Sequence, residues 1–362
     1  MKTNQLLKFT IAIKALLLVI VAQAGFAQTP APSLIAYTIP DPYTGPDGNE
    51  LWLVNSNGTN NHRLNPRILL GGIPTSPASL GRPAWSRDGT RIAADAIYYN
   101  TNILVVFNPA TGQGNAVFNT TTGTGPVAQD WFYKAFSPDG KRLVYGGNQL
   151  DYTQYGFINT DGTGDTFLGF RDLTSEAFGK GVDWSPRTDA LGWYGKQLVI
   201  SDSYTINADP TCADSPRTFA RLKLVLAVYR GMDVAWKGLT MPPQQPCSIL
   251  SYTTTNDLFP VFSPDGTRVA FARSVIDSGG QVLNSTIMTI NVSTGSVQNL
   301  RYLSGEEVDN LSWSPDGTQL LFDRIQWVGL YPNPLGVWVT SANGGGTLSR
   351  FAYPPIFAAA WN

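Results

Sequence analysis

The sequence is poor in the residues on which most catalytic and metal sites depend. Its 362 residues include one histidine, His62, and only four glutamates. One histidine excludes a metal site built from several imidazoles. Because there is also no G-x-S-x-G elbow, a hydrolase triad has no support. The sequence contains neither a phosphate-binding loop nor a dinucleotide fingerprint, and although a paired-carboxylate glycosidase stays open, nothing selects it.

Long apolar runs are also missing, except near the N-terminus. In residues 1–27, three lysines precede the apolar run 15–22, and small residues then bracket a cleavage position after Ala27. This layout predicts a secretory signal peptide. The alternative, an uncleaved membrane anchor, is disfavoured because the run is shorter than the ~20 residues needed to span a bilayer. No cysteine follows the run, so a lipoprotein signal is not supported, and we expect a secreted or periplasmic protein.

Charge and cysteine content narrow the class further. Charged residues make up 14% of the chain, and loss of the three lysines would change the net charge from −1 to −4. Such weak acidity argues against a nucleic-acid partner. After export, an oxidising compartment favours a disulfide between Cys212 and Cys247, with two buried thiols as the alternative. We expect a soluble monomer with no membrane span after cleavage.

One phrase recurs along the chain and predicts the architecture. It occurs as Trp85-Ser86-Arg87-Asp88-Gly89, Phe136-Ser137-Pro138-Asp139-Gly140, Trp184-Ser185-Pro186, Phe262-Ser263-Pro264-Asp265-Gly266 and Trp313-Ser314-Pro315-Asp316-Gly317. Proline suits the second position of a type I turn, aspartate the third, and glycine the left-handed position that follows. Alternating apolar residues flank the phrase, so each copy predicts a β-hairpin. The recurring aspartates are therefore expected to serve the turn, not catalysis.

The spacing of the motif aromatics predicts a ring of similar units. Successive intervals are 51, 48, 78, 51 and, up to Trp361, 48 residues. A period near 50 made of strands and turns is typical of a β-propeller with one four-stranded blade per repeat. Residues 357–362 read as a first strand without a second, and residues 33–37 as a second strand without a first. We therefore expect an all-β, six-bladed propeller over residues 33–362, after a short linker at 28–32, closed by pairing of the C-terminal strand with the N-terminal blade.

The 78-residue interval is the exception. We expect it to hold the fourth blade with an insertion at about residues 201–250, around the two cysteines. A degenerate seventh blade near Asp233-Val234-Ala235-Trp236 is the alternative, although only 26 residues separate Trp236 from Phe262. Further turn signals, expected to join third strands to fourth strands, occur at 55–58, 108–112, 159–162, 291–295 and 341–344.

The phrase FSPDGKRLVY, followed by a turn such as NTDGT, resembles the TolB-type propeller repeat. The resemblance covers nearly all of residues 33–362. TolB carries an α/β domain before its propeller, whereas here the repeats begin within six residues of the predicted cleavage position. The prolyl oligopeptidase and dipeptidyl peptidase families join related propellers to a hydrolase domain, which we do not expect here. The resemblance therefore implies a propeller alone, and it does not identify a partner.

Blade geometry suggests where a partner would bind. First-to-second and third-to-fourth turns share one end of the ring, the short-turn face. Second-to-third loops and blade-to-blade connections share the other end, the long-loop face, which carries the varied segments 40–49, 67–83, 148–155, 274–284 and 326–334. Variable loops on a rigid scaffold usually carry binding, and aromatic residues anchor interfaces. The candidate partner-binding residues are Tyr43, Tyr98, Tyr99, Trp131, Tyr152, Tyr155, Trp327 and Tyr331, with packing between loops as the alternative for each.

Carboxylates near the first strands form a second candidate site. The candidates for the mouth of the central channel are Asp130, Asp183, Asp257 and Asp309, with Glu306 and Glu307 nearby. Converging carboxylates could bind Ca²⁺, which takes six to eight oxygen ligands. Their offsets from the motif aromatics vary between one and six residues, so capping of strand ends is the alternative. Calcium is the only cofactor that the pattern suggests, and no metal is assigned.

Together these features predict an exported, non-catalytic scaffold. We expect it to bind a protein or peptide of the cell envelope or exterior through the long-loop face. One alternative is a calcium-dependent hydrolase or lactonase with carboxylates at the central channel. Another is a carbohydrate-binding module that uses the same aromatic loops.

Overall fold

The computed structural model describes residues 33–40, 49–70, 72–77, 79–98, 101–119, 130–149, 152–171, 181–187, 197–206, 219–230, 233–240, 253–277, 280–328, 331–352 and 357–362. The chain divides into the units Met1–Pro32 and Ser33–Asn362, and every described residue belongs to the second. The predicted signal peptide, Cys212 and Cys247 lie outside the described residues. Within the described part there are strands and turns but no helix, and so none that could cross a membrane.

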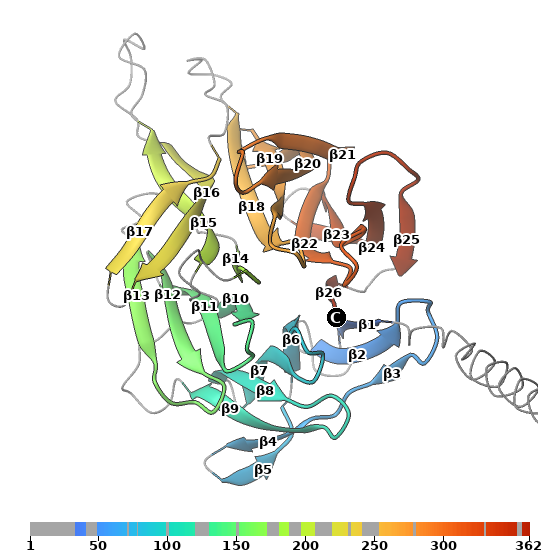
Figure 1. Ribbon diagram of the computed structural model, residues 1–362. Helices are drawn as coiled ribbons and strands as arrows, with labels where there is room; N and C mark the ends of the chain where they lie inside the picture. Colours follow the sequence, from blue (N-terminus) through green and yellow to red (C-terminus); the bar gives the residue numbers. More distant parts are fainter. Residues whose placement is uncertain are drawn as a thin grey trace, which may run out of the picture. The chain divides into compact units, whose positions relative to one another are not determined.

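The described strands form six sheets around a common centre (Figure 1). The first sheet has the order β26 (Phe357–Trp361), β1 (Leu34–Pro40), β2 (Asn49–Asn55) and β3 (His62–Arg63). The second sheet contains β6 (Ser79–Trp85), β7 (Ile92–Tyr98), β8 (Thr101–Phe107) and β9 (Gln113–Asn119), followed at its edge by β4 (Arg67–Leu70) and β5 (Ile73–Thr75). The third sheet has the order β10 (Asp130–Phe136), β11 (Arg142–Gln149), β12 (Tyr152–Asn159) and β13 (Thr166–Arg171).

The other three sheets repeat this antiparallel order. The fourth contains β14 (Val182–Trp184), β15 (Gln197–Ile206), β16 (Phe219–Arg230) and β17 (Asp233–Gly238). The fifth contains β18 (Thr254–Phe262), β19 (Arg268–Ile276), β20 (Val282–Asn291) and β21 (Val297–Ser304). The sixth contains β22 (Glu307–Trp313), β23 (Gln319–Val328), β24 (Tyr331–Ser341) and β25 (Ser349–Ala352). The all-β propeller expected from the sequence is confirmed.

The prediction of six four-stranded blades is not confirmed, because only five of these sheets have four strands. In the second sheet, β4 pairs in parallel with β9, and β5 pairs with β4, so a short hairpin extends the outer edge. The hairpin comes from the segment between the first and second sheets, which the sequence pattern suggested only as a connection. Residues 233–236, considered as a seventh blade, instead belong to the outer strand β17 of the fourth sheet.

The two ends of the Ser33–Asn362 unit meet in the first sheet. β26 pairs with β1 in the register Ile35↔Trp361 and Ala36↔Ala360. The backbone N–H of Asn362 donates to the carbonyl of Leu34 at 2.8 Å, which continues this ladder. The C-terminal strand thus covers an edge of β1 that would otherwise be open.

The repeated turns have the chemistry that their residues predict. In four copies the serine hydroxyl donates to the aspartate carboxylate at 2.6–2.7 Å, in the pairs Ser86–Asp88, Ser137–Asp139, Ser263–Asp265 and Ser314–Asp316. The glycine that follows has φ between 65° and 69° in each, the left-handed conformation that glycine adopts readily. Hydrogen bonds from the serine hydroxyl and neighbouring N–H groups lower the pKa of all four carboxyls, although burial alone would raise it. These residues recur because the turn needs them.

The core lies between successive sheets. Six buried hydrophobic clusters occur among the described residues, and each combines two sheets that are neighbours around the ring. Alternation along a strand explains this arrangement, since Leu143 packs toward the second sheet and Val144 toward the fourth. The last cluster joins Ile35 and Ala359 of the first sheet to Leu321 of the sixth. Strands covered on both sides favour near-continuous apolar runs, and β8 carries one.

Candidate functional site

The first strands of all six sheets line a central cavity of about 440 Å³. These strands are β26, β6, β10, β14, β18 and β22. The lining extends to the turn residues Arg87, Pro186, Pro264 and Pro315, which follow the motif aromatics. The cavity therefore reaches the short-turn face, the end opposite to the one that the loop lengths favoured.

Equivalent positions of the first strands carry unusual backbone conformations. Three residues before the motif aromatic stand Arg82, Gly181, Phe259 and Asn310, with φ of 39°, 120°, 52° and 58°. Positive φ is uncommon outside glycine and costs on the order of 1–3 kcal/mol per residue. Around three of these positions, in β6, β18 and β22, the strand register shifts, so each strand bulges beside the channel. All four residues line the cavity.

Side chains at this level bridge the channel. The Nη2 atom of Arg82 lies 3.5 Å from Oδ2 of Asp309, which joins the second and sixth sheets. The guanidinium carbon of Arg82 lies 5.7 Å from the ring centroid of Tyr133 in the third sheet. The Tyr133 and Phe259 rings are 6.1 Å apart between centroids, which adds the fifth sheet. A polar and aromatic layer thus connects four sheets at one level of the channel.

Burial and charge perturb this layer in identifiable ways. Burial alone would lower the pKa of Arg82, but neighbouring carboxylates, chiefly Asp309, hold it above its ordinary value. Burial raises the pKa of the Tyr133 hydroxyl. The pKa of Lys134 is lowered by burial, even though its amine contacts Oδ1 of Asp95 at 2.8 Å. Arg82 therefore stays cationic in the channel.

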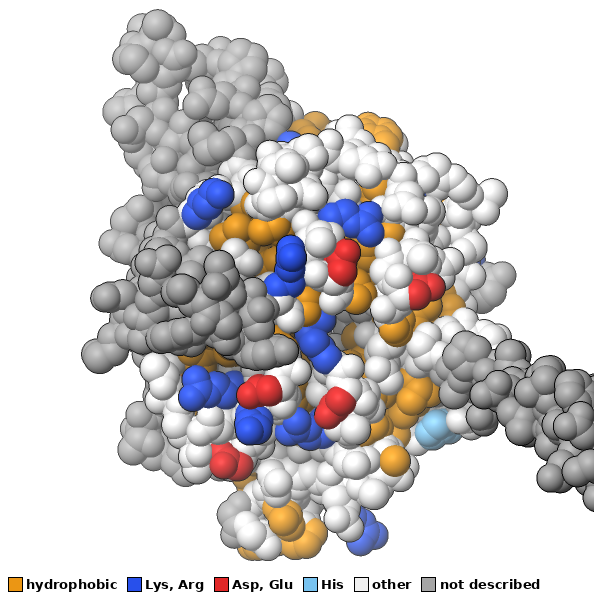
Figure 2. All heavy atoms as spheres, viewed as in Figure 1, with side chains coloured by type: hydrophobic (Ala, Val, Ile, Leu, Met, Phe, Trp, Pro, Cys, Tyr) orange, Lys and Arg blue, Asp and Glu red, His pale blue; other side chains and the backbone are white. Residues whose placement is uncertain are grey.

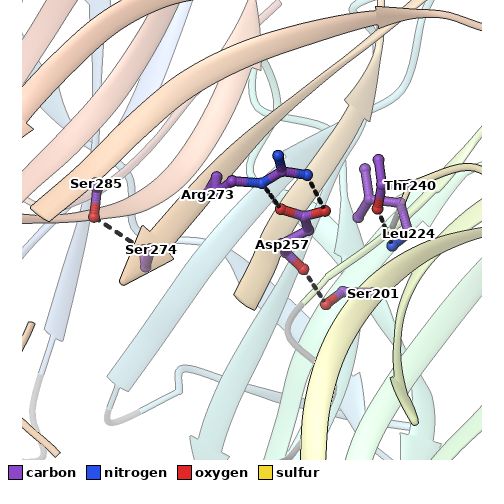
Figure 3. A network of polar contacts seen from close by, with 7 residues as sticks. All are labelled: Ser201, Leu224, Thr240, Asp257, Arg273, Ser274 and Ser285. Atoms are coloured by element: carbon purple, nitrogen blue, oxygen red, sulfur yellow. Dashed lines mark hydrogen bonds and ion pairs between the residues drawn. The ribbon is translucent and has the colours of Figure 1, made fainter. Parts of the chain in front are cut away.

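Asp257, one of the channel carboxylates proposed from the sequence, forms a bidentate ion pair with Arg273 (Figure 3). Its side chain is fully buried and accepts two hydrogen bonds from Arg273 of β19, at 2.7 and 2.9 Å. The carbonyl of Asp257 also accepts a hydrogen bond from the Ser201 hydroxyl of the fourth sheet at 2.7 Å. Its carboxylate is directed along the fifth sheet toward Arg273.

The other channel carboxylates have separate partners. Asp183 accepts hydrogen bonds from the backbone N–H groups of Trp184 and Phe262, and burial raises its pKa. Asp309 pairs with Arg82, and the side chain of Asp130 is not described. Nearby, Glu306 pairs with Arg324, and Glu307 accepts a hydrogen bond from Trp327. Within the described ranges, no group of three or more His, Cys, Asp or Glu is placed to hold a metal ion.

The aromatic candidates of the long-loop face have different surroundings. Tyr155 is buried, with 3% of its surface exposed, and its hydroxyl donates to the carbonyl of Ser201, so it belongs to the core and not to the surface. Tyr98 and Trp327 are half-buried, the first against a core cluster. Tyr43 and Tyr99 lie outside the described residues, and side chains are not described for Trp131, Tyr152 and Tyr331.

The sequence pattern did not identify Arg82, Phe259 or Arg87 as channel residues. A signal was present for the first two, because Arg82-Pro83 and Phe259-Pro260 place proline inside a strand, where it marks a bulge.

Basic side chains, with acidic ones between them, surround the centre of the face shown in Figure 2.

A ring of antiparallel sheets whose first strands line a central channel defines a β-propeller. Comparison with solved structures shows that this propeller is TolB-like. TolB from Acinetobacter baumannii matches with a TM-score of 0.59 and 15% identity, over 92% of this chain and 68% of that one. A nidogen/laminin complex matches with a TM-score of 0.53 and 10% identity, over 91% and 98%. The GH74 enzyme of Niastella koreensis matches with a TM-score of 0.50 and 11% identity, over 88% and 45%.

These likenesses show the fold alone, because the identities are low. No protein-family model matches the sequence, and no curated protein matches it. Function must therefore be argued from the surfaces of this chain.

Proposed function

We propose that this chain is an exported, non-catalytic propeller scaffold that binds a protein or peptide partner through its long-loop face. The TolB-like fold supports a scaffold role by analogy only. The observation that carries the proposal is the exposure of large apolar side chains where strands of the fifth and sixth sheets reach this face.

Three exposed side chains lie at these strand ends. Leu283, near the start of β20, is 42% exposed, and Tyr302, near the end of β21, is 61% exposed. Val328 ends β23 and is 62% exposed. The Glu306–Arg324 ion pair at 2.6 Å belongs to the sixth sheet, where Glu306 directly precedes β22 and Arg324 lies in β23. Apolar side chains held on rigid strands with a polar surround are typical of protein interfaces.

The proposal is tested by capture from cell-envelope extracts with the mature chain as bait. The triple variant Leu283→Ser, Tyr302→Ser, Val328→Ser should lose the captured protein. Val297→Ser is the matched control, because Val297 is also 48% exposed but begins β21 at the short-turn face. If the triple variant captures the same protein as wild type, this surface is not the binding site. Glycan-array binding that the triple variant loses would instead favour the carbohydrate alternative.

Several further assignments belong to the same proposal. Residues 1–27 would act as a signal peptide, which N-terminal sequencing of the exported protein at Gln28 would test. We count the six-stranded sheet as one blade with an added hairpin, so the ring has six blades; the six inter-sheet clusters support this count. A Cys212–Cys247 disulfide would follow from export, and mass spectrometry before and after reduction would detect it.

A further inference from the structure

The short-turn end of the channel departs from the repeat at one position. The residue after the motif serine is proline in four copies, but in the second sheet it is Arg87. The turn does not need this arginine, since the Gly89 N–H donates to the Ser86 carbonyl at 2.8 Å as in three of the proline-containing copies. The reason for an arginine at this position must therefore lie in what its guanidinium contacts.

Arg87 reaches across the channel. Its Nη2 donates to the carbonyl of Trp184 at 2.9 Å. Arg87 follows β6 of the second sheet and Trp184 ends β14 of the fourth, so the contact joins two sheets that are not neighbours around the ring. This is the only hydrogen bond that the Arg87 side chain makes to another described residue, and a guanidinium has several further donors. Those donors lie at the end of the cavity.

The cavity combines a few charged side chains with an apolar wall. Its charged lining residues are Arg82, Arg87, Lys134 and Asp183. Arg82 is paired with Asp309 and Lys134 with Asp95, both outside the lining. The Asp183 carboxylate accepts two backbone hydrogen bonds, and the positive charge of Arg87 acts on it without a hydrogen bond between the two side chains. Much of the remaining wall consists of aromatic residues and prolines. The volume of about 440 Å³ lies within the range of small-molecule pockets.

We propose that this cavity binds a small organic carboxylate with an aromatic or apolar body. Arg87 holds the carboxylate at the short-turn end by a bidentate hydrogen-bonded pair, for which its planar guanidinium is suited. The body lies against the aromatic wall of the channel. Because this site and the long-loop face are at opposite ends of the sheets, carboxylate binding and partner capture are separable functions.

Calorimetric titration of the mature protein tests this site. The probes are benzoate, 3-phenylpropionate and indole-3-acetate, each compared with its primary amide. At least one carboxylate should bind, and its amide should bind roughly tenfold more weakly because the charge-assisted pair is lost. Arg87→Gln should weaken carboxylate binding by a similar factor. Arg142→Gln is the control, because Arg142 is an exposed arginine near the short-turn face but outside the cavity lining.

Arg87→Pro provides a second variant that restores the residue found in the other copies, so the turn should fold. It should lose binding as Arg87→Gln does, with an unchanged circular dichroism spectrum. The proposal is overturned if none of the three carboxylates binds at millimolar concentration, if amides bind as well as acids, or if both Arg87 variants bind like wild type.

Discussion

The carboxylate of Asp183 accepts a hydrogen bond from the backbone N–H of Phe262 at 2.7 Å, which joins the first strands of the fourth and fifth sheets. The same carboxylate accepts the N–H of Trp184 at 2.8 Å. Asp183→Ala should leave both donors without this acceptor, at a cost of about 1–3 kcal/mol for each buried group. Asp183→Asn keeps one acceptor oxygen and should cost less. Urea unfolding measures both, and equal stability of Asp183→Ala and wild type would contradict the role assigned to this contact.

The free energy of unfolding should depend on pH through the aspartates of the repeated turns. Hydrogen bonds from Ser314 and Thr318 lower the pKa of Asp316. A carboxyl with a lowered folded-state pKa stabilises the fold above the unfolded value of about 3.9, and this contribution is lost as the pH falls. Asp316→Asn should therefore flatten the fall in unfolding free energy between about pH 5 and pH 2. Asp183→Asn should instead steepen this fall. Burial raises the pKa of Asp183, so the wild-type carboxyl adds stability as the pH falls, and the variant lacks this contribution.

The hairpins were predictable from sequence because their causes are local. Serine, aspartate and glycine meet within five residues, so the turn chemistry can be read without knowledge of the ring. The fourth sheet was harder, because Arg187 stands where the other copies have aspartate and the spacing to Phe262 is long. Among residues 201–250, where the sequence predicts an insertion, the described strands are the end of β15 together with β16 and β17.

Contacts across the channel could not be predicted from sequence in the same way. Arg82 and Tyr133 are 51 residues apart and belong to different sheets, so their contact depends on how the sheets are arranged around the ring. The offsets of Asp183, Asp257 and Asp309 from their aromatics differ, and the structure gives each a different partner. Loop length likewise favoured the long-loop face, whereas the cavity reaches the short-turn face.

The motif tryptophans allow a matched comparison. The indole N–H of Trp313 donates to the carbonyl of Val261 in the preceding sheet at 3.1 Å. Trp184 holds the same motif position, but its buried indole N–H has no hydrogen-bond partner among the described residues. Trp313→Phe should therefore cost about 1 kcal/mol more than Trp184→Phe, because only the first loses a hydrogen bond. Chemical denaturation of the two variants gives the difference, and a larger cost for Trp184→Phe would contradict this account.

Calcium should not stabilise the folded protein. Asp257 is paired with Arg273, Asp309 with Arg82, and Asp183 with two backbone N–H groups, so these carboxylates would have to give up partners to bind a cation. A thermal melt with excess calcium, compared with one in chelator, should show the same midpoint. A calcium-dependent rise of several degrees would show a site that binds the folded state and would revive the calcium-enzyme alternative.

Gly181 should tolerate no side chain. Its φ is 120°, and a Cβ atom added there would lie 2.7 Å from Cδ of Pro260 and 2.9 Å from Cα of Phe259. The second contact is with backbone, which cannot move without shifting the bulge of β18 that places Phe259 beside Tyr133. Gly181→Ala should therefore lower the free energy of unfolding by about 2 kcal/mol or more.

Gly238→Ala is the control for this substitution. Gly238 ends β17, lacks a positive φ, and has no atom within 4 Å of an added Cβ. Its replacement should leave stability within about 0.5 kcal/mol of wild type. If Gly181→Ala and Gly238→Ala melt alike, the fourth and fifth sheets do not approach closely at Gly181. If only Gly181→Ala loses stability, the bulge of β18 depends on close contact with the backbone of the fourth sheet at Gly181.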